Sequence, residues 1–208
     1  MDGAERAVAI RRIARAADPD RAIATLFAPA EARDDLFVLY AFNAELARIA
    51  DQVSEPALGA IRLQWWREAI ERAAGGEVTG HFVADAFGEV LARRSLSRNR
   101  IAGLIDARTF DVGETIMPDT RTLDAYLFDT TGGLFALAAQ IVGAKGEKRD
   151  LVAEIGGRAY GLVRVMRSLP TPARAIYEIG SVSKTMAAVL LADLIERGQA
   201  SLDDPLSD

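Results

Sequence analysis

The chain has 208 residues, of which 50% are hydrophobic, and it carries 25 Lys and Arg against 30 Asp and Glu. That length allows one domain or two small ones, and a net charge of −5 argues against a general nucleic-acid binder. Because cysteine is absent, disulfides, thiol catalysis and cysteine-ligated metals are excluded.

Apolar residues recur at helical spacing up to about residue 168, which predicts an all-α fold. The arginine-rich first 17 residues lack a secretory apolar core, and no run is as long as a membrane span. We therefore expect a protein without a transmembrane segment that is cytoplasmic or peripheral to a membrane. The single histidine, His81, lies in a turn segment, where we expect no catalytic role.

The expected helices are separated by proline and glycine. The first long one begins near Ala30 and ends at Glu55-Pro56, because the residue before a proline disfavours helix. The next ends at Gly75-Gly76. Further helices are expected over residues 82–93, 97–113, 122–142 and 148–168.

Packing expectations follow from these helices. Adjacent tryptophans cannot both face one core, and we predict that Trp65 packs inside while Trp66 lies at a groove or surface. Residues predicted to be buried are Leu39, Tyr40 and Leu46. Two small-residue runs, Thr131-Gly132-Gly133 and Gly156-Gly157, are predicted to let helix backbones approach closely.

Four sequence blocks together resemble the squalene/phytoene synthase family. They are Leu26 to Pro29; Leu39 to Asn43 with Trp65-Trp66; Tyr126 with Thr131 to Gly133 and Val142-Gly143; and Ala159-Tyr160-Gly161-Leu162. The resemblance implies an isoprenoid-synthase-like helical bundle over residues 1–170. It also implies that the last helices of that fold are missing, which would expose apolar faces and favour self-association.

The family's prenyl transfer uses two carboxylates one helical turn apart to hold Mg²⁺, which draws off pyrophosphate. Alignment on Tyr40-Ala41-Phe42 places this pair at Ala47 and Asp51, so one ligand remains. Glu45 lies on the other side of the helix and cannot replace Ala47. Asp51 is expected near solvent or a polar groove, where it would form a surface ion pair with Arg48.

The family's second acidic motif is also reduced, since this chain has Arg167-Ser168 where catalytic members carry Arg-Asp. Asp106 and Asp111 fall where relatives carry acids, but five residues apart they diverge on a helix. By resemblance, the substrate or metal residues would be Asp51, Asp111 and Tyr160, with Mg²⁺ needed only if prenyl transfer survives.

The segments Asn43 to Ala47 and Val53 to Pro56 resemble an aspartate-poor branch of the family that includes a mitochondrial complex I assembly factor. That resemblance implies a scaffold, assembly or lipid-binding role, with a protein partner or an isoprenoid or lipid ligand. An active prenyltransferase remains an alternative.

From about residue 175 the chain resembles class C β-lactamases and penicillin-binding proteins, through Tyr177 to Thr185 and Gly198 to Pro205. The resemblance implies that Ser181 is a nucleophile assisted by Lys184, in a strand–helix fragment over residues 171–208. The rest of that fold is absent, so a serine hydrolase, the other alternative, would be inactive. The junction near residue 170 could be natural, an artefact of sequence assembly or gene calling, or constructed.

Overall fold

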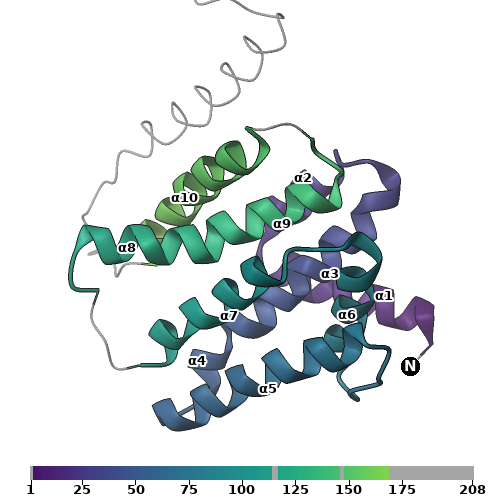
Figure 1. Ribbon diagram of the computed structural model, residues 1–208, viewed down its shortest axis with the longest axis horizontal. Helices are drawn as coiled ribbons and strands as arrows, with labels where there is room; N and C mark the ends of the chain where they lie inside the picture. Colours follow the sequence, from purple (N-terminus) through teal and green to yellow (C-terminus); the bar gives the residue numbers. More distant parts are fainter. Residues whose placement is uncertain (1, 114–116, 146–147, 169–208) are drawn as a thin grey trace, which may run out of the picture.

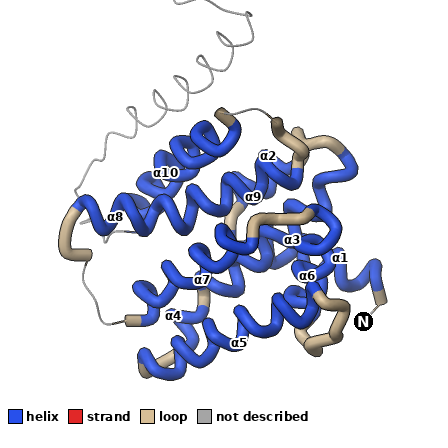
Figure 2. The backbone as a smooth tube through the Cα atoms, in the orientation of Figure 1, coloured by secondary structure: helices blue, strands red, loops and turns tan. Residues whose placement is uncertain are grey.

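The computed structural model describes residues 2–113, 117–145 and 148–168. Within them every regular element is a helix and none is a strand, which confirms the all-α prediction for this part (Figures 1 and 2). The expected strand–helix fragment over 171–208 lies outside the described residues. The elements are α1 Gly3–Ala17, α2 Pro19–Thr25, α3 Ala30–Ala47, α4 Ile49–Gln52, α5 Pro56–Ala74, α6 Phe82–Arg94, α7 Arg98–Val112, α8 Thr120–Leu127, the π-helix η1 Phe128–Gly132, α9 Gly133–Ile141 and α10 Arg149–Ser168.

Short polar side chains set several helix starts. Asp2 and Glu5 form a reciprocal capping box at α1, and Asp18 accepts the Arg21 backbone N–H at the start of α2. Ser97 and Asp119 cap α7 and α8 in the same way. These caps satisfy N–H groups that have no partner within the helix, so they fix where each helix begins.

Helix α3 lies at the centre of the bundle and contacts α1, α6, α7 and α9. Its Phe42 is fully buried, stacks on Phe87 with ring centroids 4.2 Å apart, and meets Trp66 at 5.6 Å. Leu39 and Leu46 are buried as predicted. Tyr40 is only partly buried, because its side of α3 faces a cavity.

Two of the predicted helices are interrupted. The expected single helix from Ala30 to Glu55 is wrong, because α3 ends at Ala47 and α4 begins at Ile49. Between them Arg48 forms a turn, in which its N–H donates to the carbonyls of both Ala44 and Leu46. The expected helix over 122–142 contains η1, in which Thr130 and Thr131 hydroxyls bond the carbonyls four residues back. Side-chain competition of this kind leaves no trace in hydrophobic periodicity.

The prediction for the two tryptophans is wrong. Trp66 is 5% exposed and Trp65 is partly buried. Trp66 shares the inner face of α5 with Leu63 and Ile70, three and four residues away, whereas Trp65 is rotated off that face. His81 contacts both indole rings and accepts the Ala84 N–H, so it acts as the N-cap of α6.

Helix α10 packs closely against η1. A Cβ atom added at Gly157 would lie 2.5 Å from the Thr131 carbonyl oxygen, and one added at Gly161 would meet the Thr131 hydroxyl. The predicted close helix approach is therefore confirmed. The outer side of α10 exposes several large apolar side chains: Leu151, Val152, Ile155, Leu162 and Met166. Self-association through them stays a prediction.

Candidate functional site

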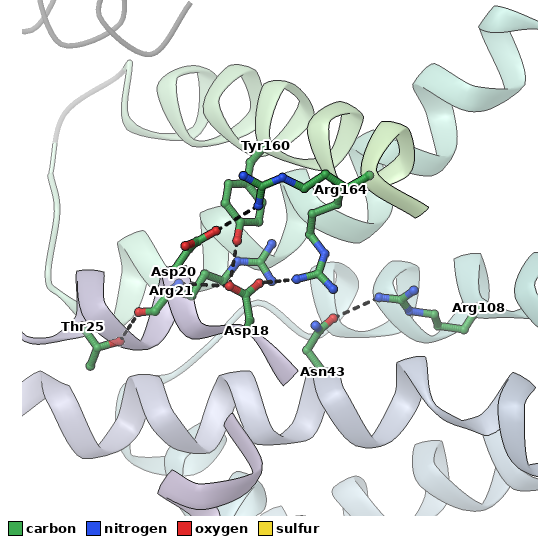
Figure 3. A network of polar contacts seen from close by, with 9 residues as sticks. Asp18, Asp20, Arg21, Thr25, Asn43, Arg108, Tyr160 and Arg164 are labelled. Carbon is green, nitrogen blue, oxygen red and sulfur yellow. Dashed lines mark hydrogen bonds and ion pairs between the residues drawn. The ribbon is translucent and has the colours of Figure 1, made fainter. Parts of the chain in front are cut away.

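Asp18 is the centre of a polar cluster at the junction of α1 and α2 (Figure 3). It is 5% exposed. Its Oδ1 accepts the Arg21 backbone N–H at 3.0 Å and the Tyr160 hydroxyl at 2.7 Å, and its Oδ2 lies 2.7 Å from Arg164 Nη1. Arg21 Nη1 lies 3.3 Å from the same Oδ2. One carboxylate therefore joins α2 to α10 and serves two guanidinium groups.

Arg21 is a buried cation, 5% exposed, enclosed by aromatic rings. Its guanidinium carbon lies 4.6 Å from the Tyr160 ring centroid, 5.4 Å from Phe135 and 5.8 Å from Tyr40. Nε and Nη2 are buried without a hydrogen-bond partner. Burial lowers the pKa of Arg21, and the neighbouring Asp18 carboxylate opposes this shift. The side chain is charged, and its hydrogen bonding is incomplete.

A cavity of about 170 Å³ opens beside this cluster, between the α1–α2 junction, α3, α4 and α10. Three arginines and two aspartates line it, so the wall carries one net positive charge. Burial raises the pKa of the Tyr40 hydroxyl, so this side chain is a neutral donor on the wall. The lining residues are Ala17, Asp18, Arg21, Tyr40, Asn43, Ala44, Ala47, Arg48, Asp51 and Arg164.

The positions of the family's first metal-binding pair, Ala47 and Asp51, both lie on this cavity. Asp51 is exposed to solvent and lines this polar cavity, as predicted. The expected Arg48–Asp51 ion pair is wrong: Arg48 reaches back 3.0 Å to Glu45, whose buried carboxylate requires a counter-ion. Among the described residues, no three His, Asp or Glu side chains are grouped to hold a metal ion.

Asp111 belongs to a second cluster, on α7. It accepts from Arg108 and from the Tyr126 hydroxyl, each at 2.8 Å. Arg108 also donates to Asn43 Oδ1 at 3.1 Å, which connects α7 to the cavity wall on α3 (Figure 3). Burial raises the pKa of Tyr126 to about 12, so this hydroxyl stays a donor to Asp111. Asp106 instead pairs with Arg67 on α5, and the two aspartates diverge as predicted.

Of the residues selected by resemblance, Tyr160 and Asp51 lie on or beside one cavity, and Asp111 is linked to it through Arg108 and Asn43. Burial, followed by the bond to Asp18, raises the pKa of Tyr160 to about 12. The sequence patterns did not single out Arg21, Arg164 or Asp18. One signal was available for the carboxylate, since Asp18 before Pro19 is a strong helix-start pattern.

Residues 14–177 match the squalene/phytoene synthase family, and the chain belongs to it. The helical bundle observed over the described residues is consistent with the isoprenoid-synthase-like fold that the resemblance implied. No helix in the part of the chain that the structure describes has the length and apolar character needed to cross a membrane.

Within that family, the chain is similar to a human protein named NADH dehydrogenase (ubiquinone) complex I, assembly factor 6, with 30% identity over 156 residues. That region is 75% of this chain and 47% of the human protein. The bovine protein gives the same values, and a Drosophila melanogaster homolog is 26% identical over 163 residues, 76% of this chain and 48% of its own. The chain thus spans about half the length of these curated relatives.

The hydrolase-like C-terminal segment receives no support from these matches. None of the relatives named above is a serine hydrolase, and the family match runs to residue 177, past the expected junction near 170. Ser181 and Lys184 lie outside the described residues. The division into domains over 1–170 and 171–208 therefore stays a prediction.

Proposed function

We propose that this chain is a member of its family that does not transfer prenyl groups and that acts by binding, in an assembly role like that named for its relatives. The observation that carries this proposal is the cavity wall, where Ala47 stands in place of an aspartate and Asp51 is exposed at the surface. One exposed carboxylate binds Mg²⁺ weakly, because the ion keeps most of its water and needs further charged ligands.

The other aspartates near the cavity support the same proposal. Asp18 is held by Arg21, Arg164 and Tyr160, and Asp111 by Arg108 and Tyr126. Recruiting either one to a metal would leave a buried or partly buried arginine without its counter-ion, at a cost of several kcal/mol. The arginines therefore compete with a cation for each carboxylate.

Two measurements test the proposal. The first is condensation of farnesyl or geranylgeranyl diphosphate with Mg²⁺, for which we expect no product above a no-enzyme control. The variant Ala47→Asp restores the missing carboxylate and is expected to stay inactive, since Ser168 still stands in the second motif. Product that disappears in Asp51→Ala would contradict the proposal.

The second measurement concerns assembly. Deleting the gene in its own host is expected to lower the amount of assembled NADH dehydrogenase complex on native gels. Re-expression of the wild-type chain and of Asp51→Ala should restore it equally, because the proposed role needs no metal. Unchanged assembly in the deletion strain would refute the assembly role without bearing on the absence of prenyl transfer.

A further inference from the structure

The end of α2 and the turn after it carry three large apolar side chains on the protein surface. Ile23, Leu26 and Phe27 are 59%, 52% and 87% exposed, and we call these three residues the apolar tip. Their spacing of three and four residues places them close together, on the side of α2 away from the bundle. Single exposed apolar side chains are normal, but a cluster marks an interaction surface. None of the three lines the cavity beside Asp18.

The backbone of the apolar tip is hydrogen-bonded within the protein. The N–H groups of Leu26, Phe27 and Ala28 donate to carbonyls three residues earlier, at 3.0, 3.1 and 3.1 Å. The next residue is Pro29, which has no N–H. Because every N–H of this turn is satisfied or absent, the turn can enter the low-dielectric edge of a bilayer without exposing an unpaired donor to lipid.

One cation lies directly behind the apolar tip. Arg33 Nε donates at 2.9 Å to the carbonyl of Ala28, the residue that follows Phe27. Within the described part of the chain Arg33 has no carboxylate partner. Glu31 is exposed two residues earlier and offsets part of this charge. The Arg33 guanidinium therefore keeps donors for an anionic group beside the apolar side chains.

We propose that the apolar tip inserts into the interface of a lipid bilayer, with Phe27 in the acyl boundary and Arg33 at the level of the phosphate headgroups. Aromatic rings favour this interface, and arginine side chains extend from it toward headgroups. A lipid surface fits better than a protein partner, because it offers hydrocarbon to a projecting ring and phosphate to the cation behind it without a matching pocket. The inference goes beyond the proposed function and holds or fails independently of it.

The test is co-sedimentation of the full chain with vesicles of phosphatidylcholine, with and without phosphatidylglycerol. We expect saturable binding that is tighter to the vesicles with the anionic lipid. Phe27→Ser should weaken binding to both kinds of vesicle about tenfold or more, because it removes the largest inserted apolar surface. Arg33→Gln should weaken binding about fivefold on the anionic vesicles alone, and Arg33→Lys should keep most of it. Glu31→Gln should strengthen binding to the anionic vesicles.

Two variants elsewhere in the bundle are matched controls. Val78→Ser changes a side chain that is also 87% exposed but lies in the loop between α5 and α6. Arg62→Gln removes a charge from α5, where Arg62 likewise donates to a neutral oxygen, that of Gln52. Helices α2 and α5 lie at opposite edges of the view in Figure 1. Both controls should bind vesicles as the wild type does, and circular dichroism should show all variants equally helical.

A second readout locates the contact in the bilayer. Phe27→Trp should bind as the wild type does, and its added indole should shift its emission to the blue and be quenched by brominated lipid. The wild type, with Trp65 and Trp66, gives the background for this measurement.

Three results would overturn the proposal: no binding to either kind of vesicle, equal losses in Phe27→Ser and Val78→Ser, or vesicle-bound Phe27→Trp with unchanged emission. A Phe27→Ser variant that keeps vesicle binding but lowers the amount of assembled NADH dehydrogenase complex in the host would identify the tip as a protein contact, and this too would overturn it. None of these outcomes bears on the absence of prenyl transfer.

Discussion

Replacing Asp18 with asparagine leaves the buried Arg21 guanidinium without its counter-ion while changing almost nothing else. Asparagine is as good an N-cap as aspartate, so the bond from the Arg21 backbone N–H is kept. Breaking a buried ion pair by removing one partner costs about 3–5 kcal/mol. The second partner, Arg164, is half exposed and adds at most about 1 kcal/mol.

The retained amide oxygen still accepts from Tyr160, so we place the loss in the free energy of unfolding at about 3–4 kcal/mol. For a chain of this size each kcal/mol lowers Tm by about 2–4 °C, which gives a fall of about 6–16 °C. Urea unfolding followed by helical circular dichroism measures the change directly, and thermal melting provides a second reading.

Asp20→Asn is the control, because Asp20 lies two residues away on the same helix and pairs only at the surface with Arg167, at 3.3 Å. Its loss should be within about 0.5 kcal/mol of zero. The reasoning would be refuted if Asp18→Asn and Asp20→Asn had equal effects, since the Arg21 charge would then need no counter-ion.

Three further outcomes are expected. Gly157→Ala should lower the free energy of unfolding by about 1–3 kcal/mol in urea titrations, because its Cβ would clash with the η1 backbone. Gly156→Ala should be tolerated, since its Cβ would be 3.7 Å from the nearest atom. Equal effects of the two variants would contradict the close packing. Burial raises the pKa of Tyr126 to about 12 in the folded chain, whereas the same hydroxyl ionises near pH 10 in the unfolded chain. The free energy of unfolding should therefore fall between pH 10 and 12, and Tyr126→Phe should make that fall smaller. Fluorescent penicillin or fluorophosphonate should not label Ser181 specifically, and stoichiometric labelling lost in Ser181→Ala would make the hydrolase hypothesis primary.

Helical periodicity was enough to predict most of the fold. The bounds of α6, α7 and α10 and the end of α5 differ from expectation by two residues or fewer, because long amphipathic stripes and glycine or proline ends identify such helices. The interruption at Arg48 could not be foreseen, since it depends on hydrogen bonds that any residue type can make. Which tryptophan is buried, Trp66 or Trp65, depends on how α5 is rotated about its axis, and the helices packed against α5 determine that rotation.

The candidate site was predictable only in part. Tyr160 and Asp51 could be found by resemblance, and the sequence shows directly that Ala47 has replaced the other carboxylate of the metal-binding pair. Arg21 could not, because nothing in the sequence distinguishes it from the other basic residues, 25 in all. Burial is what distinguishes it, and burial of Arg21 depends on Tyr160, supplied by a helix more than 130 residues later.

The bond between Asp18 and Tyr160 spans 142 residues, which has a consequence for synthesis of the chain. At about 5–20 residues per second, the ribosome delivers Tyr160 roughly 7–28 s after Asp18. During that interval α10 has not been made, so Tyr160 cannot enclose Arg21. The Arg21 guanidinium therefore stays hydrated on the nascent chain, at a position that is buried in the finished fold. The bundle therefore closes late, and a factor that shields this region on the nascent chain would act before α10 is made.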